Sequence, residues 1–214
     1  MTQRKWIYSK WVCGVTAGVC LWLALGLSGV RADEVRILFL GDSLTAGLGV
    51  KKNQAYPAVV AQLLRQQGYS EFQIINGGIS GATTAGAASR LKWHLKAAPH
   101  VLVLALGAND GLRGLSLDTM AKNLDDTITL ALENNLCVIL AGMKIPPNYG
   151  PDYTRRFSQT FRDLAGQHGI LLIPFLLENV GGVRNMNQAD GVHPNAAGHR
   201  QIARTVLPWL LGCL

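Results

Sequence analysis

The chain has 214 residues, of which 49% are hydrophobic and 15% charged, and this length suffices for one α/β domain with a full core. The formal net charge is +7, but four of the 20 Lys and Arg residues lie within residues 1–32 and all 13 Asp and Glu residues follow them, so the charge without that segment is +3. This balance is ordinary for a soluble enzyme and gives no support to nucleic-acid binding.

The first 32 residues have the pattern of a signal peptide. A positively charged start precedes an uncharged, mostly apolar run over residues 11–30, and Val-Arg-Ala at 30–32 has the small residues that signal peptidase requires. We expect residues 1–32 to be cleaved, residues 33–214 to form a single domain, and the mature protein to be periplasmic or secreted with no stable membrane partner. A retained membrane anchor is the alternative, because twenty residues can just span a bilayer.

Two cysteines remain after this segment. Cys137 opens an apolar run, so we expect a buried small hydrophobic side chain there. An oxidising compartment would also permit a bridge between Cys137 and Cys213, which is the less favoured alternative.

Strand and helix patterns alternate along the rest of the chain. In order, apolar runs and helical spacing predict a strand at 35–40, a helix at 54–67, a strand at 72–75, a helix at 83–96, a strand at 101–106, a helix at 117–134, a strand at 136–143, a helix at 153–167, a strand at 170–173 and a helix from 194 to about 210. Strands that are apolar throughout indicate a parallel sheet with helices on both faces. The predicted fold is α/β, a three-layer α/β/α, flavodoxin-like domain with about five parallel strands.

The strand at 35–40 stops abruptly at Gly41-Asp42-Ser43. Gly41 permits a tight turn, and a serine just past the carboxyl end of a strand lies where open α/β sheets bind their ligands. Ser43 is therefore a candidate nucleophile. Alternatively, Asp42 and Ser43 only cap the next helix, or the turn cradles a phosphate.

Three other polar segments converge on the same edge of the predicted sheet. They are NGGISGAT at 76–83, GAND at 107–110 and DGVHPN at 190–195. A serine hydroxyl needs an adjacent base, for which His193 is the candidate, and Asp190 is close enough in sequence to orient its imidazole.

An ester-cleaving serine also needs hydrogen-bond donors for the oxyanion of its tetrahedral intermediate. The backbone N–H groups of Ser43 and Gly81 and the side-chain amide of Asn109 can supply them. Taken singly, each of these residues could instead be an ordinary turn or cap residue.

Together these blocks resemble the SGNH, or GDSL, hydrolases over residues 35–210. The motifs GDSLTAG, GANDGLRG, PPNYG and DGVHPN are most similar to the bacterial periplasmic thioesterase, arylesterase and lysophospholipase branch. The resemblance implies Ser43 as nucleophile, His193 as base, Asp190 as its partner, and Ser43, Gly81 and Asn109 as the oxyanion hole, in a flavodoxin-like fold without metal or cofactor. One departure is Ala82, where close relatives often carry an acidic residue, and this puts the hydrogen bonding of that loop in doubt.

The expected activity is hydrolysis of carboxylic esters and thioesters through a Ser43 acyl-enzyme, of the acyl-CoA thioesterase, arylesterase or lysophospholipase type. The expected partner is a small acyl or aryl ester or thioester, lysophospholipid included, and we expect a monomer that binds no nucleic acid. Loops 111–117 and 144–152 are expected to shape the acyl pocket, unless they are ordinary packed loops; their candidate residues are Leu112, Leu115, Ile145, Pro146, Pro147 and Tyr149. Two alternatives remain: a carbohydrate O-deacetylase of the same family, and a non-catalytic flavodoxin-like module that binds a phosphate or flavin.

Overall fold

A computed structural model describes residues 34–214 of the protein. Its centre is a five-stranded parallel sheet with strand order β2-β1-β3-β4-β5. The strands are β1 (Val35–Gly41), β2 (Phe72–Gly78), β3 (Val101–Ala105), β4 (Cys137–Ala141) and β5 (Leu171–Ile173). The inner strands are apolar because both of their faces are covered, and Ile37 to Leu40 of β1 are completely buried.

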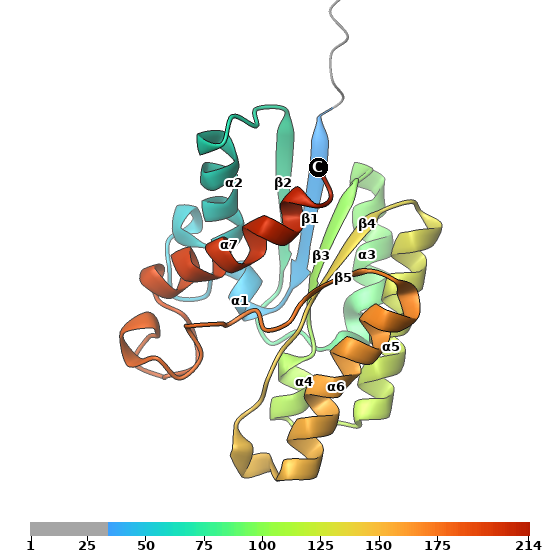
Figure 1. The fold of residues 1–214 in the computed structure, drawn as a ribbon, viewed down its shortest axis with the longest axis vertical. Coiled ribbons are helices and arrows are strands. Elements are labelled where there is room, and N and C mark those ends of the chain that lie inside the picture. The colour runs from blue at the N-terminus through green and yellow to red at the C-terminus, as the bar shows by residue number, and fades with distance from the viewer. Residues whose placement is uncertain (1–33) are drawn as a thin grey trace, which may run out of the picture. The chain divides into compact units, whose positions relative to one another are not determined.

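Helices cover both faces of the sheet, which makes three layers. They are α1 (Ser43–Ala46), α2 (Tyr56–Gln66), α3 (Ala87–His94), α4 (Ala108–Leu112), α5 (Leu117–Glu133), α6 (Pro151–His168) and α7 (Ala196–Leu211). Helices α2 and α7 pack together on one face, and α3, α5 and α6 form a row on the other (Figure 1). The prediction of a three-layer, flavodoxin-like α/β fold is confirmed.

Several element boundaries differ from the predicted ones. Strand β2 continues through Asn76, Gly77 and Gly78 because these residues pair with the end of β1. The helix predicted at 83–96 is a 3-10 turn, α3 and a second 3-10 turn in succession. Short helices α1 and α4 were not predicted, and each carries a candidate site residue.

The expectation for Cys137 was wrong. Its sulfur is bonded to that of Cys213 across 76 positions of sequence. Cys137 begins β4 and Cys213 follows α7, so the bridge fastens the last helix to the amino end of a central strand.

All five strands point the same way, so their carboxyl ends form one edge (Figure 1). We call this the catalytic edge, because the candidate site residues lie along it. No helix within residues 34–214 has the length and apolar character needed to cross a bilayer. The signal-peptide prediction concerns residues outside the described part of the chain and stays a prediction.

Candidate active site

Ser43 lies at the turn between β1 and α1. Asp42 is the cap of α1, with Oδ1 accepting a hydrogen bond from the backbone N–H of Leu44 at 3.0 Å. Ser43 is thus the first residue of the helix and does not cap it. Gly41 is required here, because a Cβ atom at that position would lie 1.9 Å from Oγ1 of Thr45. The tight turn leaves Ser43 mostly buried.

His193 and Asp190 lie in the loop before α7 and reach Ser43. Nε2 of His193 is 3.1 Å from Oγ of Ser43, and Nδ1 of His193 is 2.6 Å from Oδ2 of Asp190. Residues 43 and 193 are 150 positions apart in sequence. This relay is the arrangement in which a carboxylate orients an imidazole and the imidazole takes a proton from a hydroxyl.

The carboxylate of Asp190 is held in its charged form. Its Oδ1 accepts hydrogen bonds from the backbone N–H groups of His193 and Val192, each at 2.9 Å. The backbone bond from His193, followed by the side-chain bond from the same residue, lowers the pKa of Asp190 to about 2. Asp190 therefore stays ionised across the pH range in which an imidazole changes charge.

The three candidate oxyanion donors lie at the ends of β1, β2 and β3. Gly81 has φ of +77°, a conformation that favours glycine, and its carbonyl accepts a hydrogen bond from Nη2 of Arg113 at 3.0 Å. Within residues 34–214, the backbone N–H groups of Ser43 and Gly81 donate to no protein acceptor. Asn109 lies in α4, and its Nδ2 donates to the carbonyl of Ala82 at 3.0 Å and to Oδ2 of Asp42 at 3.4 Å.

Sequence reasoning missed the roles of two ionisable residues behind this turn, Asp42, which is buried, and Arg90, which is half-buried. Asp42 is nearly inaccessible, and desolvation raises its pKa to about 6. Arg90 of α3 donates from Nη2 to the carbonyl oxygens of Gly41, at 2.8 Å, and Gly77. It thereby ties the ends of β1 and β2 together. The one hint in the sequence is that Arg90 precedes the core residue Leu91 in a helix rich in alanine.

The two predicted pocket loops are fastened to each other. Tyr149 Oη donates to the carbonyl of Leu112 at 2.7 Å, and Tyr153 Oη donates to that of Leu115 at 3.0 Å. Ile145 is buried, whereas Leu112, Leu115 and Pro146 are exposed and Tyr149 is half-buried. Their contact with substrate stays a prediction.

Two other histidines have partners outside the Ser43 relay. His199 is buried against Tyr56, and His168 pairs with Asp125. Nowhere in residues 34–214 do three or more His, Cys, Asp or Glu side chains gather as a metal ion would require.

Comparison with known proteins identifies the family. Residues 39–201 match the model of the GDSL-like lipase/acylhydrolase family. The chain is 39% identical to esterase TesA of Pseudomonas aeruginosa, over 88% of this chain and 94% of that protein. It is 34% identical to thioesterase 1/protease 1/lysophospholipase L1 of Escherichia coli, over 74% of this chain and 75% of that protein.

A solved structure supports the same family assignment. The crystal structure of TesA superposes with a TM-score of 0.80 at 39% identity, covering 84% of this chain and 99% of that one. The chain therefore belongs to the GDSL-like lipase/acylhydrolase family and is an ester hydrolase. The expectation of an ester-cleaving enzyme of this family is confirmed.

Proposed function

We propose that the enzyme hydrolyses esters and thioesters through an acyl-enzyme on Ser43. The observation that carries this proposal is the relay from Ser43 Oγ to His193 Nε2, at 3.1 Å, and from His193 Nδ1 to Asp190, at 2.6 Å. Oγ of Ser43 attacks the carbonyl carbon while Nε2 of His193 takes its proton. The ionised Asp190 stabilises the imidazolium that forms.

The tetrahedral intermediate carries a negative oxygen that needs donors. In the proposed mechanism the N–H groups of Ser43 and Gly81 supply two, and Asn109 supplies a third by exchanging its long bond to Asp42 for one to the oxyanion. His193 then gives its proton to the departing alkoxide or thiolate. A water molecule, deprotonated by the same imidazole, attacks the acyl-enzyme and releases the acid.

The proposed substrates are small esters and thioesters of one acyl or aryl group, lysophospholipid included. Support comes from the names of the relatives, an esterase and a thioesterase/lysophospholipase. It comes also from exposed Leu112 and Leu115 beside the site, which offer apolar contact to an acyl chain.

We further infer that the enzyme works as a monomer in the periplasm or outside the cell. The N-terminal leader pattern supports export. The Cys137–Cys213 bridge adds to it, because disulfides persist in oxidising compartments.

Covalent labelling tests the mechanism. A fluorophosphonate probe followed by peptide mapping should place the label on Ser43, and the label should disappear in His193→Ala. Ser80→Ala is the matched control and should label fully, because Ser80, which precedes Gly81 in the chain, has no part in the proposed relay. Label on Ser80 instead, or full labelling of His193→Ala, would overturn the proposal.

A further inference from the structure

Apolar side chains surround the catalytic serine on the outside of the protein. Ten large hydrophobic residues within 34–214 are exposed, and five of them lie at the catalytic edge, four on its loops and one at the end of α4. These five, each 37–54% exposed, are Leu48, Ile79, Leu112, Leu115 and Val192. We call them the apolar rim. Exposed apolar side chains gathered around a site, rather than scattered singly, indicate an interaction surface.

Hydrogen bonds hold the loops of the rim around Ser43. On one side, Nε2 of Gln188 donates to the carbonyl of Leu48 at 2.7 Å, and its backbone N–H donates to the carbonyl of His193 at 2.7 Å. Leu48 is thereby joined to the loop that carries Val192 and His193.

On the other side, the loop of Ile79 is held by two bonds. The N–H of Ile79 donates to the carbonyl of Gly41 at 3.1 Å. Arg113, which lies between Leu112 and Leu115, donates to Gly81 of the same loop at 3.0 Å. The rim is therefore a fixed feature of the site.

Cations lie on the same chain segments as the rim residues. Lys51, Lys52, Arg113 and Arg184 are all exposed, and none of them forms an ion pair with a carboxylate of residues 34–214. Lys51 and Lys52 follow Leu48 in the turn after α1, and Arg113 lies inside the rim itself.

Most carboxylates near this edge are already engaged. Asp118 and Asp152 begin α5 and α6 and pair with arginines, and Asp190 pairs with His193. Glu178 is the exception. By contrast, three exposed glutamates lie near the amino-terminal edge of the sheet: Glu34, Glu71 and Glu133. The catalytic edge is therefore cationic and apolar together.

We propose that this edge docks on an anionic lipid surface, with the rim inserted at the headgroup level and the four cations against lipid phosphates. Shallow insertion of apolar side chains combined with attraction of Lys and Arg to anionic lipids is the physics of interfacial binding. A second copy of this chain fits poorly, because a symmetric contact would bring the same cations face to face. The inference rests on the proposed function: a lipid ester would pass to Ser43 along Leu112 and Leu115 without crossing water.

Vesicle sedimentation tests the docking in Ser43→Ala protein, which leaves the lipid intact. Intact mass should show that every variant has the same N-terminus, so that any contribution from the N-terminal segment is common to all. We expect binding to phosphatidylcholine vesicles containing phosphatidylglycerol to exceed binding to pure phosphatidylcholine by about tenfold or more, and to weaken as salt rises.

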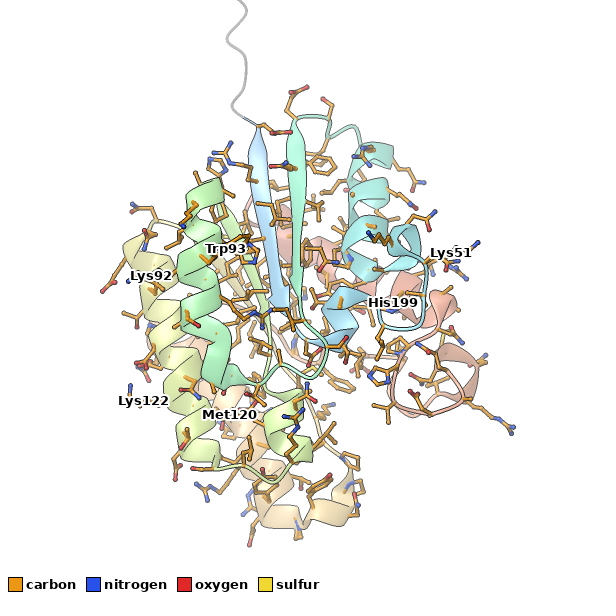
Figure 2. All side chains as sticks on the ribbon, turned by 180° about the vertical axis from the view of Figure 1, so that it is seen from behind. Lys51, Lys92, Trp93, Met120, Lys122 and His199 are labelled. Carbon is orange, nitrogen blue, oxygen red and sulfur yellow. A yellow bond between two sulfur atoms is a disulfide. The ribbon has the colours of Figure 1, made fainter. Side chains whose placement is uncertain are left out.

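Two double variants and two matched controls locate the surface. Leu48→Ser with Ile79→Ser, and Lys51→Gln with Lys52→Gln, should each lower binding to anionic vesicles by about tenfold. The controls make the same kinds of change elsewhere and should bind as the parent does: Trp93→Ser with Leu132→Ser, and Lys92→Gln with Lys96→Gln. Figure 2 shows Lys51 beside the turn after α1, and Lys92 and Trp93 next to α3 on the other side of the molecule.

Three outcomes would overturn the docking: equal binding to neutral and anionic vesicles, equal loss in the controls, or a dimer in solution that the Leu48→Ser, Ile79→Ser variant dissociates. With Ser43 restored, all four double variants should hydrolyse a soluble short-chain ester at the parent rate. If the enzyme hydrolyses the soluble ester but does not bind vesicles, only the docking proposal is contradicted. If the fluorophosphonate does not label Ser43, the proposed function is contradicted.

Discussion

Nδ2 of Asn109 lies 3.0 Å from the carbonyl oxygen of Ala82 and 3.4 Å from Oδ2 of Asp42. The first bond fixes the amide beside Ser43, and the second is long enough to be exchanged at little cost. In the proposed mechanism, Asn109 is therefore placed in advance for an oxyanion that exists only during the reaction.

Replacing Asn109 by alanine should lower kcat by about a hundredfold or more and change KM much less, because the proposed bond forms chiefly in the transition state. Steady-state kinetics on a soluble ester would measure both constants. Asn134→Ala, which removes an exposed amide at the end of α5, is the control and should be unaffected. A kcat equal to that of the wild type would leave Asn109 with only a structural bond to Ala82.

Asp42 should make the protein less stable as the pH rises. Burial raises its pKa to about 6, above the ordinary value of 3.8, so between these values the folded state holds a proton that the unfolded state has released. The free energy of unfolding therefore decreases through that window. Asp42→Asn keeps a cap acceptor for Leu44 and removes the charge.

Asp42→Asn should accordingly raise the Tm at pH 8 by an amount corresponding to at most about 3 kcal/mol. The gain should shrink as the pH falls toward 4. Thermal unfolding followed across that range checks both statements. A gain that does not depend on pH would mean that the charge of Asp42 is not its cause.

His199 should have the opposite effect on stability. Nδ1 of His199 accepts the backbone N–H of Tyr56 at 3.2 Å, and burial lowers the pKa of its imidazole to about 4. Because the folded pKa lies below the ordinary 6.5, the unfolded state binds the proton first as the pH falls. Stability that is complete above about pH 6.5 is therefore lost progressively toward pH 4.

Urea unfolding of wild type and His199→Gln separates this residue from the others. Glutamine can still accept the Tyr56 bond but does not titrate, so the variant should lose less stability between pH 7 and pH 4 than the wild type. His168→Gln is the control at a half-buried histidine on α6. Parallel curves for wild type and His199→Gln would contradict the assignment.

Ser43 and His193 should behave as one catalytic unit. Ser43→Ala and His193→Ala should each lower kcat by about 10⁴-fold or more, and the double variant should be scarcely worse than either. Asp190→Ala should be milder, because the imidazole keeps part of its function. The pair of His168 and Asp125 has the same 2.6 Å separation far from the site, so His168→Ala should retain full activity. Additive losses in the double variant would contradict the proposal that Ser43 and His193 act as one unit.

Removing the Cys137–Cys213 bridge should destabilise the fold without stopping catalysis. A separation of 76 residues predicts a loss of about 4.5 kcal/mol by the loop-entropy estimate. Unfolding of Cys213→Ser, or of reduced wild type, would measure it, and the kcat on a soluble ester should stay within about twofold. Equal stability of the oxidised and reduced forms would exclude a stabilising role.

The sequence predicted the sheet well because its signal is local. Fully apolar runs identify buried parallel strands, and the polar turns after them identify the catalytic edge. What was missed depends on contacts between distant segments. The sequence predicts a turn at Gly77 and Gly78, yet a Cβ atom at Gly78 would lie 2.2 Å from the backbone of Ala46. These glycines let α1 pack closely against the end of β2.

The same limit applies to the site. The positions of Ser43, Asp190 and His193 could be proposed from motif order alone. By contrast, the burial of Asp42 and the bonds of Arg90 to two strand ends follow from packing that no short motif encodes. For the same reason the sequence offers the disulfide only as the less favoured alternative, since its formation depends on where α7 ends.

The relay joins residues 150 positions apart, and this has a consequence for when activity arises. His193 lies just before α7, which packs against α2, so we expect it to reach Ser43 only once that helix has docked. Contacts this distant in sequence form late, because the intervening loop must close first. The turn that carries Ser43 can be in place while His193, its proposed base, is still absent. Nascent chains and C-terminally truncated fragments should therefore carry a complete GDSL motif and remain inert.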